Sequence, residues 1–512
     1  MVKEETKEKL KKWLNNKNNL YLLGILILAF AIRLYYFILT KDQTLWWDEA
    51  EYMASAKALA FHFPWEISPQ RTMLFPFLAS LVYRLGLGEL SIKFILVLMP
   101  SVLVVFTTYL FVKEIYNEKI ALITSFITAV CWIHIFYTER VMNDELGFLF
   151  GLLAFFFFWK GYVSGKNNKL VYLSAFFIAL SFLIRPTGIY YAIIIALFLF
   201  VTEQFRFLKK KQLWIMIPVF LLTLSPYLIW SQAYHGNAFA FTSAYTGPNT
   251  SIQGYGWWML QFVYDYPELI FFIFFLAGLL TLIPLALSID KLAKGEKNYQ
   301  NDLLMLISIL FILIFSIFML RAGENRWLMI MSLGIFVLSA KGILLFMGFI
   351  NKNLGKTIAV VLLVLILVLG AYFQLKHNDI LIKEKLESYA PVKNAGLWIK
   401  ENSNSTDKVF SRSWPQTAYY SDRETFTFDM LYTTEKNESD FTSLLLKNKP
   451  KYMVLSIFEP HSPWLIGWPQ KYSYAVTPVK VYQGVISGTP QPFLVIYEMN
   501  YSELEKPRVI IK

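Results

Sequence analysis

The sequence predicts a polytopic α-helical membrane protein with a C-terminal α/β domain outside the membrane. The 512 residues are 56% hydrophobic and only 16% charged, and the mean hydropathy is +0.46. This composition excludes one large soluble domain, which would need far more charge. The hydrophobic residues occur in runs of about 20, the length that crosses a bilayer as a helix.

The predicted C-terminal domain, residues 376–512, has a different pattern. Short alternating runs at 452–457 and 493–497 are typical of strands, and segments 392–401 and 440–447 are typical of helices. We therefore expect a small α/β domain after the last membrane span.

The distribution of Lys and Arg predicts the topology. The Lys-rich segment 1–19 is expected to be a cytoplasmic tail by the positive-inside rule. Its apolar continuation has no small-residue cleavage site, so it is interpreted as an uncleaved first span. About eleven spans are predicted at 20–39, 90–112, 120–136, 146–162, 170–184, 189–201, 213–230, 268–287, 303–320, a tenth that ends near the basic segment 341–356, and 357–373. The loop 40–90 and the C-terminal domain are then extracytoplasmic, in a multi-pass protein of the plasma membrane.

Other global features limit the partners. The net charge of +12 is interpreted as loops that face anionic lipid, and no nucleic-acid partner is expected. The single cysteine, Cys131, excludes a disulfide or a Cys-based zinc site within one chain. Four Asn-X-Ser/Thr sequons fall in segments predicted to be external, at Asn249, Asn404, Asn437 and Asn500.

An acid-rich stretch follows the first predicted span. It reads Trp46-Trp47-Asp48-Glu49-Ala50-Glu51-Tyr52. Asp48 and Glu49 can supply a general base and a second carboxylate that orients a substrate. Trp47, Glu51 and Tyr52 are the candidates for contacts with an acceptor or a sugar. The alternative is an ordinary helix start at the membrane interface, with Asp48 as the N-cap.

A second group of charges is predicted on the same side of the membrane. Arg33 lies inside the first span, where an ionisable residue indicates function, although it could also snorkel to the interface. The charged residues at the external ends of later spans are Glu139, Arg140, Asp144, Glu145, Arg185, Arg321 and Arg326. Each alone fits a solvated loop or an anchor. Together they suit an enzyme that binds a lipid-linked phosphate and activates a hydroxyl.

Metal and nucleotide chemistry have less support. The five histidines, His62, His134, His235, His377 and His461, have no ligand spacing to one another. A divalent cation held by Asp48 and Asp144 is left open, because hard cations take carboxylates. The Gly-rich stretch 247–256 lacks the lysine of a phosphate-binding loop.

Four motifs together resemble a known class of enzymes. They are Asp48-Glu49 after the first span, the segment Arg71-Thr72-Met73-Leu74-Phe75-Pro76, Arg140 with Asp144, and Arg185-Pro186-Thr187-Gly188. Over residues 20–375 the chain resembles the GT-C membrane glycosyltransferases. It is most similar to the dolichyl-phosphate-mannose protein mannosyltransferase-like family (glycosyltransferase family 39), which is related to the aminoarabinose lipid A transferases.

The resemblance implies a reaction and roles for these residues. A sugar would move with inversion from a polyprenyl-phosphate donor to an acceptor hydroxyl on the extracytoplasmic face. Asp48 would be the base and Glu49 its partner. The residues expected at the donor or its phosphate are Arg33, Arg71, Arg140, Asp144, Arg185 and Arg326. The acceptor, whether protein, lipid or glycan, and transfer of a whole oligosaccharide are left open.

The charged residues are also compatible with two other classes of function. A transporter also carries charges at membrane depth, but on broken helices near the midplane. In this chain the charges are predicted to gather at one face, which favours the enzyme. A purely structural membrane protein is disfavoured by the two acidic loops.

Overall fold

The computed structural model has two compact units. It describes residue 8 and residues 13–61, 63–242, 254–288, 291–292, 297–321, 323–428, 438–486 and 489–506. The helical unit comprises residues 1–41, 69–75 and 89–383, and the sheet unit comprises residues 42–68, 76–88 and 384–512. Most of the loop predicted between the first two spans therefore packs with the C-terminal residues. Of the four sequons, Asn249 and Asn437 lie outside the described residues.

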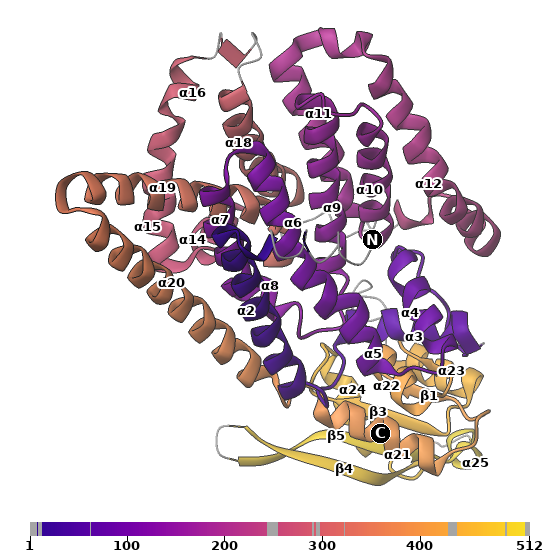
Figure 1. Ribbon diagram of the computed structural model, residues 1–512. Coiled ribbons are helices and arrows are strands. Elements are labelled where there is room, and N and C mark those ends of the chain that lie inside the picture. Colours follow the sequence, from indigo (N-terminus) through magenta and orange to yellow (C-terminus); the bar gives the residue numbers. More distant parts are fainter. Residues whose placement is uncertain are drawn as a thin grey trace. The chain divides into compact units, whose positions relative to one another are not determined.

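The helical unit is built from long apolar helices (Figure 1). The helices that concern its core and site are α2 (Lys17–Leu39), α5 (Glu89–Lys93), α6 (Met99–Ile115), α7 (Glu118–Val130), α8 (Trp132–Phe136), α9 (Asp144–Phe158), α10 (Leu170–Ile184), α11 (Ile189–Glu203), α12 (Lys211–His235), α14 (Phe262–Asp265), α15 (Glu268–Leu279), α16 (Ile283–Leu287), α18 (Lys297–Phe315), α19 (Ile330–Leu354) and α20 (Lys356–Lys385). Short π- and 3-10-helical turns extend or join them, among them η1 (Phe94–Leu98), η2 (Trp159–Val163), η3 (Pro186–Gly188), η4 (Gln204–Lys209), η7 (Trp257–Gln261), η9 (Ser316–Leu320) and η10 (Asn325–Leu328).

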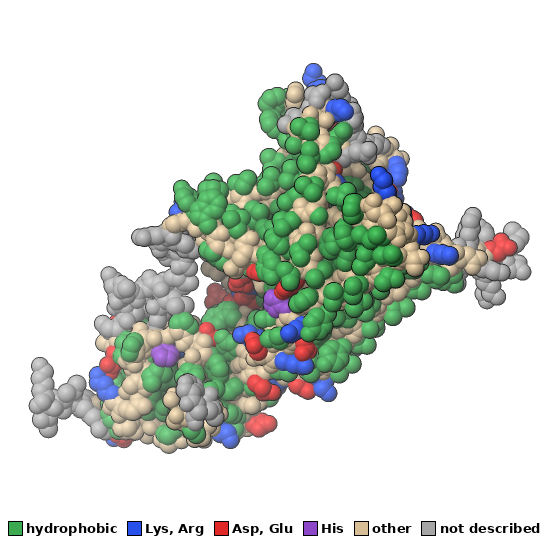
Figure 2. Space-filling view, turned by 90° about the vertical axis from the view of Figure 1, so that its left-hand side faces the viewer, with side chains coloured by type: hydrophobic (Ala, Val, Ile, Leu, Met, Phe, Trp, Pro, Cys, Tyr) green, Lys and Arg blue, Asp and Glu red, His purple; other side chains and the backbone are tan. Residues whose placement is uncertain are grey.

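Within the described part of the chain, nine helices are long and apolar enough to cross a membrane, and α10 is a shorter apolar helix. Hydrophobic side chains cover most of the visible face of this unit (Figure 2). On α20, for example, Val361 is 61% exposed and Val368 is 58% exposed. Apolar side chains left uncovered in this way are expected of helices that contact lipid. The predicted polytopic helical class is confirmed, and the number of eleven spans stays a prediction.

The third predicted span, residues 120–136, is not one continuous helix. Cys131 has extended backbone angles (φ −63°, ψ 126°) and separates α7 from α8. The N–H of Trp132 donates to Oε1 of Gln374 at 2.8 Å, in place of a helical carbonyl. A side chain from α20 thus satisfies a backbone donor that the break exposes.

The sheet unit contains one mixed sheet with strand order β2-β1-β3-β5-β4 (Figure 1). β1 is parallel to β2 and β3, and β5 is antiparallel to β3 and β4. The strands are β1 (Val409–Ser411), β2 (Thr425–Phe426), β3 (Tyr452–Ser456), β4 (Val476–Ile486) and β5 (Thr489–Met499). The helices are α3 (Trp47–Phe61), most of α4 (Leu74–Arg84), α21 (Ala390–Asn402), α22 (Trp414–Ser421), α23 (Glu438–Asn448), α24 (Pro463–Lys471) and α25 (Tyr501–Leu504). The predicted strands and helices of the C-terminal region lie in β3, β5, α21 and α23.

Both faces of β3 are buried, because its alternate side chains enter two different cores. Tyr452 and Val454 pack with α21 residues such as Ile399. Met453 and Leu455 pack in a second core with residues of α23 and α24. Two covered faces make this a small three-layered α/β unit.

Candidate active site

Asp144, Arg185 and Arg326 come together in the helical unit. Asp144 is the first residue of α9, and its side chain is 1% exposed. Its carboxylate forms an ion pair with the Arg185 guanidinium, and Nη1 of Arg326 lies 3.9 Å from Oδ2 of Asp144. Two guanidinium groups flank this carboxylate, and Arg326 also pairs with the more exposed carboxylate of Glu324. Such a cluster can hold an anionic oxygen.

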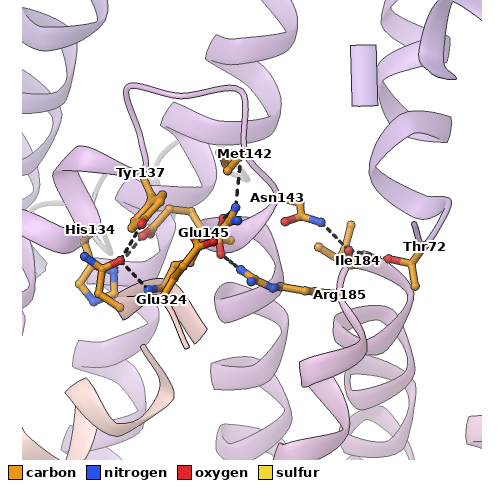
Figure 3. A network of polar contacts seen from close by, with 12 residues as sticks. Thr72, His134, Tyr137, Met142, Asn143, Glu145, Ile184, Arg185 and Glu324 are labelled. Carbon is orange, nitrogen blue, oxygen red and sulfur yellow. Dashed lines mark hydrogen bonds and ion pairs between the residues drawn. The ribbon is translucent and has the colours of Figure 1, made fainter. Parts of the chain in front are cut away.

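The direction of Arg185 follows from the proline after it. A residue before proline is disfavoured in helical conformation, so α10 ends at Ile184 and Arg185 is extended (φ −157°, ψ 130°). The Ile184 carbonyl accepts hydrogen bonds from Nδ2 of Asn143 at 2.7 Å and from Oγ1 of Thr72 at 2.8 Å (Figure 3). These two side chains tie the end of α10 to the loop before α9 and to segment 69–75.

The glycine of the Arg-Pro-Thr-Gly motif allows a close approach of backbones. A Cβ on Gly188 would lie 2.4 Å from backbone atoms of Ser181 and Phe182. Only glycine fits at this distance, so η3 folds back against α10 and keeps Arg185 at the start of the turn. The Arg185-Pro186-Thr187-Gly188 motif therefore forms a tightly packed turn between α10 and α11.

Arg326 is positioned by the residue before it. Oδ1 of Asn325 accepts the backbone N–H of Arg326 at 2.8 Å and the Tyr137 hydroxyl at 2.6 Å. The Asn325 carbonyl accepts the Tyr266 hydroxyl. Nε of Arg326 also donates to Glu324 at 2.6 Å. Sequence reasoning missed Asn325 and both tyrosines, since its only signal was that Asn325 precedes a candidate arginine.

Asp144, Arg185 and Arg326 line a cavity with about 30 Å³ accessible to water. This volume has room for about two water molecules. Its walls include Asp144, Ser181, Arg185, Thr187, Tyr191 and Arg326. The Tyr191 hydroxyl has no hydrogen-bond partner among the described residues. A buried hydroxyl left in this way is available to a ligand. The cavity thus combines guanidinium, carboxylate and hydroxyl groups on one small surface.

A buried polar group lies deeper in the helical unit. Nδ1 of His134 is 2.9 Å from Oε1 of Glu145, and both side chains are fully buried. Arg33 is also fully buried: its Nε donates to Oγ of Ser101 at 2.7 Å and its Nη1 to the Ala129 carbonyl at 2.9 Å. Arg33 is enclosed by protein, so it does not snorkel. Arg33 is not among the cavity-lining residues, and its contact with the donor stays a prediction.

The loop 137–143 is buried, which rules out the solvated-loop alternative. Glu139 is 2% exposed and Arg140 is 3% exposed. Oε2 of Glu139 accepts from Oγ1 of Thr40 at 3.0 Å, and Lys93 donates to the same Thr40 oxygen at 2.7 Å. Burial raises the pKa of Glu139 to about 8. Arg71, also expected at the donor, is partly exposed beside Thr72, in segment 69–75.

The acid-rich stretch forms the start of α3 in the sheet unit. The helix begins at Trp47, so Asp48 lies in the first turn and not at the cap position. Oε2 of Glu49 accepts the Trp46 backbone N–H at 2.5 Å, as the third residue of a capping box does. Glu49 and Glu51 are buried, whereas Asp48 is partly exposed. Asp48 is therefore the carboxylate of the three that is best placed to meet a substrate.

Aromatic side chains pack around this helix. Trp47 is partly exposed and makes an edge-to-face contact with Trp414, whose ring stacks on Trp65 with centroids 4.5 Å apart. Tyr52 is 5% exposed and belongs to the core. Nζ of Lys57 donates to Oδ1 of Asp422 at 2.8 Å, which links α3 to the end of α22. Of the three predicted acceptor contacts, Trp47 is thus the one with an exposed surface, since Glu51 and Tyr52 are both buried.

Within the ranges that the structure describes, there is no group of three or more His, Cys, Asp or Glu side chains that could hold a metal ion. The Asp144 carboxylate is already paired with a guanidinium. A divalent cation on Asp48 and Asp144 stays a prediction.

Comparison with known proteins supports the resemblance. Residues 70–230 match the model of the dolichyl-phosphate-mannose-protein mannosyltransferase family. This segment contains Arg71, Arg140, Asp144 and Arg185. No curated protein matches the chain.

Solved structures match nearly the whole chain. ArnT from Cupriavidus metallidurans in the apo state is 12% identical with a TM-score of 0.65, over 95% of this chain and 99% of ArnT. The same protein bound to undecaprenyl phosphate gives a TM-score of 0.64. An oligosaccharyltransferase from Archaeoglobus fulgidus, tethered to an acceptor peptide, is 15% identical with a TM-score of 0.61, over 94% of this chain and 74% of that enzyme. The chain thus has the fold of the GT-C membrane glycosyltransferases, which confirms the fold class and the resemblance that the sequence predicted.

Proposed function

We propose that this integral membrane protein is a glycosyltransferase that moves a sugar from a polyprenyl-phosphate donor to an acceptor hydroxyl. The family match over residues 70–230 and the GT-C fold support the reaction class. ArnT has been solved with undecaprenyl phosphate, and an archaeal oligosaccharyltransferase with dolichol phosphate. A polyprenyl phosphate therefore suits the donor of this chain.

The Asp144, Arg185 and Arg326 cluster is the observation that carries the proposal. In this reaction the bond between the anomeric carbon and the phosphate oxygen breaks, and negative charge grows on the leaving phosphate. Fixed guanidinium groups in a water-poor site stabilise such charge without rearranging in the transition state. Arg185 and Arg326 would bind the phosphate, and Asp144 would hold both arginines in place.

Asp48 would act as the general base. It would remove the proton of the acceptor hydroxyl, whose oxygen attacks the anomeric carbon on the face opposite the phosphate and inverts its configuration. Glu49 supports this role indirectly, because its hydrogen bond to Trp46 fixes the first turn of α3. Trp47 offers a partly exposed ring for a sugar or another acceptor.

The proposal includes a location and a division of the chain. Residues 1–19 would form a cytoplasmic tail, residues 20–375 with loop 40–90 the catalytic module, and residues 376–512 an extracytoplasmic domain. The site would face the outer side of the plasma membrane. The acceptor would be a lipid, a glycan or a protein hydroxyl.

The test is transfer of labelled sugar by the purified full-length protein from a panel of polyprenyl-phosphate sugars, beginning with mannose and aminoarabinose. Asp48→Asn should abolish transfer while binding of polyprenyl phosphate is retained. Asp42→Asn is the matched control, since Asp42 is an exposed acid in the same segment, and it should keep full activity. Full transfer by Asp48→Asn at normal abundance would remove the base role.

A further inference from the structure

The connection between α11 and α12 concentrates positive charge. Residues 204–214, the basic hook, read Gln-Phe-Arg-Phe-Leu-Lys-Lys-Lys-Gln-Leu-Trp and contain no acidic residue. The charged side chains, all exposed, are Arg206, Lys209, Lys210 and Lys211. Among the described residues, none of the three lysines forms an ion pair. Other lysines of the helical unit do: Lys166, in the turn before α10, pairs with Glu114, and Lys341, within α19, pairs with Asp302.

The same segment exposes large apolar side chains. Phe205 is 69% exposed, Leu208 is 45% exposed and Trp214 is 54% exposed. None of the six residues of η4 is buried. Aromatic and aliphatic groups between lysines are the pattern of segments that lie at a membrane interface.

The hook is held in a defined shape by its own hydrogen bonds. Nε1 of Trp214 donates to the Leu208 carbonyl at 2.6 Å, and Nε of Arg206 to the Glu203 carbonyl at 3.2 Å. α11 ends at this point, where Gln204 has a φ of 52°. The connection between α11 and α12 is therefore an ordered turn (Figure 1), and it carries all four basic residues within six positions of the sequence.

We infer that the basic hook binds the headgroups of anionic phospholipids in the surrounding bilayer. One candidate membrane span, Pro186–Lys209, ends within the hook and the next, Lys211–His235, begins within it, so the hook lies where two spans leave the hydrocarbon. Clusters of four or more Lys and Arg at such a point attract anionic lipid. The ammonium groups face phosphodiester oxygens, and Phe205, Leu208 and Trp214 lie against the acyl chains.

Trp214 supplies the readout. The full-length protein is reconstituted in phosphatidylcholine vesicles with a minor fraction of phosphatidylglycerol, and brominated acyl chains are placed on one lipid or the other. The chain has 15 tryptophans, so the contribution of Trp214 is obtained as the quenching that disappears in the Trp214→Phe variant. This difference reports which lipid lies beside the hook. Brominated phosphatidylglycerol should quench Trp214 more strongly than its bulk fraction predicts, and raising the ionic strength should reduce the preference.

A charge-matched pair of variants separates the hook from net charge. Replacing Arg206, Lys209, Lys210 and Lys211 by Gln should lower the preference for phosphatidylglycerol by about tenfold. Replacing Lys166, Lys169, Lys352 and Lys356 by Gln removes the same charge elsewhere and should leave the preference unchanged. The inference fails if Trp214 is quenched equally by both lipids, if the hook variant keeps the preference, or if millimolar inorganic phosphate abolishes it. Sugar transfer by both variants checks that they are folded.

Discussion

The Tyr137 hydroxyl donates a hydrogen bond to Oδ1 of Asn325 at 2.6 Å, and the residue after Asn325 is Arg326. The two partners come from distant parts of the chain, the loop before α9 and the turn before α19. Through this bond the loop that precedes Asp144 also sets the position of an arginine that faces it. Asn325 and Tyr137 are thus positioning residues for the phosphate site that we propose.

Tyr137→Phe should weaken donor binding while the fold is kept. One hydrogen bond of this kind contributes about 1 kcal/mol, so the KM for the polyprenyl-phosphate donor should rise about fivefold with little change in kcat. Steady-state kinetics with varied donor measure this, beside thermal unfolding. Tyr372→Phe, on the exposed surface of α20, is the control. An unchanged donor KM would show that the bond does not position Arg326.

Arg185→Lys should reduce catalysis despite its retained charge. A guanidinium has a planar fork of donors that can hold a carboxylate and a phosphate together, whereas an ammonium is a point charge. The kcat/KM should fall at least about tenfold, a loss of roughly 1.4 kcal/mol of transition-state stabilisation. Arg84→Lys is the matched control, because Arg84 is exposed and bonds only a backbone carbonyl among its described contacts. Wild-type activity of Arg185→Lys would show that the planar fork of the guanidinium is not required for catalysis.

Gly151→Ala should disturb the wall of the cavity. A Cβ at Gly151 would lie 1.9 Å from a ring atom of Tyr191, so the ring would have to move. Overpacking of this kind costs about 1–3 kcal/mol, and both the unfolding temperature and transfer should fall. Gly24→Ala is a control, since a Cβ there meets nothing within 4 Å. If both variants behave alike, Tyr191 is not held in place by this contact.

Glu139→Gln should change how stability depends on pH. Burial raises the pKa of Glu139 from 4.5 to about 8, so the folded state keeps a proton that the unfolded state releases. The contribution of Glu139 to the free energy of unfolding is therefore full at low pH and is lost as pH rises from about 4.5 to about 8. The unfolding temperature of Glu139→Gln should fall less over this range than that of the wild type. Glu66→Gln, at an exposed position, should retain the wild-type dependence, and an identical slope in Glu139→Gln would contradict the assignment.

The sequence predicted the helical class, the α/β character of the C-terminal region and several members of the site, because hydropathy and strand alternation are local patterns. It did not predict the break at Cys131, since the bond that stabilises the break comes from Gln374. It also did not predict that segments 42–68 and 76–88 pack with the C-terminal residues. Both depend on contacts between distant parts of the chain.

For the candidate site, the sequence by itself determined that Arg185 leaves its helix, because Pro186 restricts the residue before it. It also determined which charges were available, among them Asp48 and Arg326. Only the tertiary structure decided which of them meet: Arg326 approaches Asp144, whereas Arg33 bonds Ser101 and two carbonyls. It also separated Glu49, buried in a helix cap, from Asp48 at the surface. The reason is physical, since the position of a charge depends on how the helices pack, and no pattern within one segment contains that information.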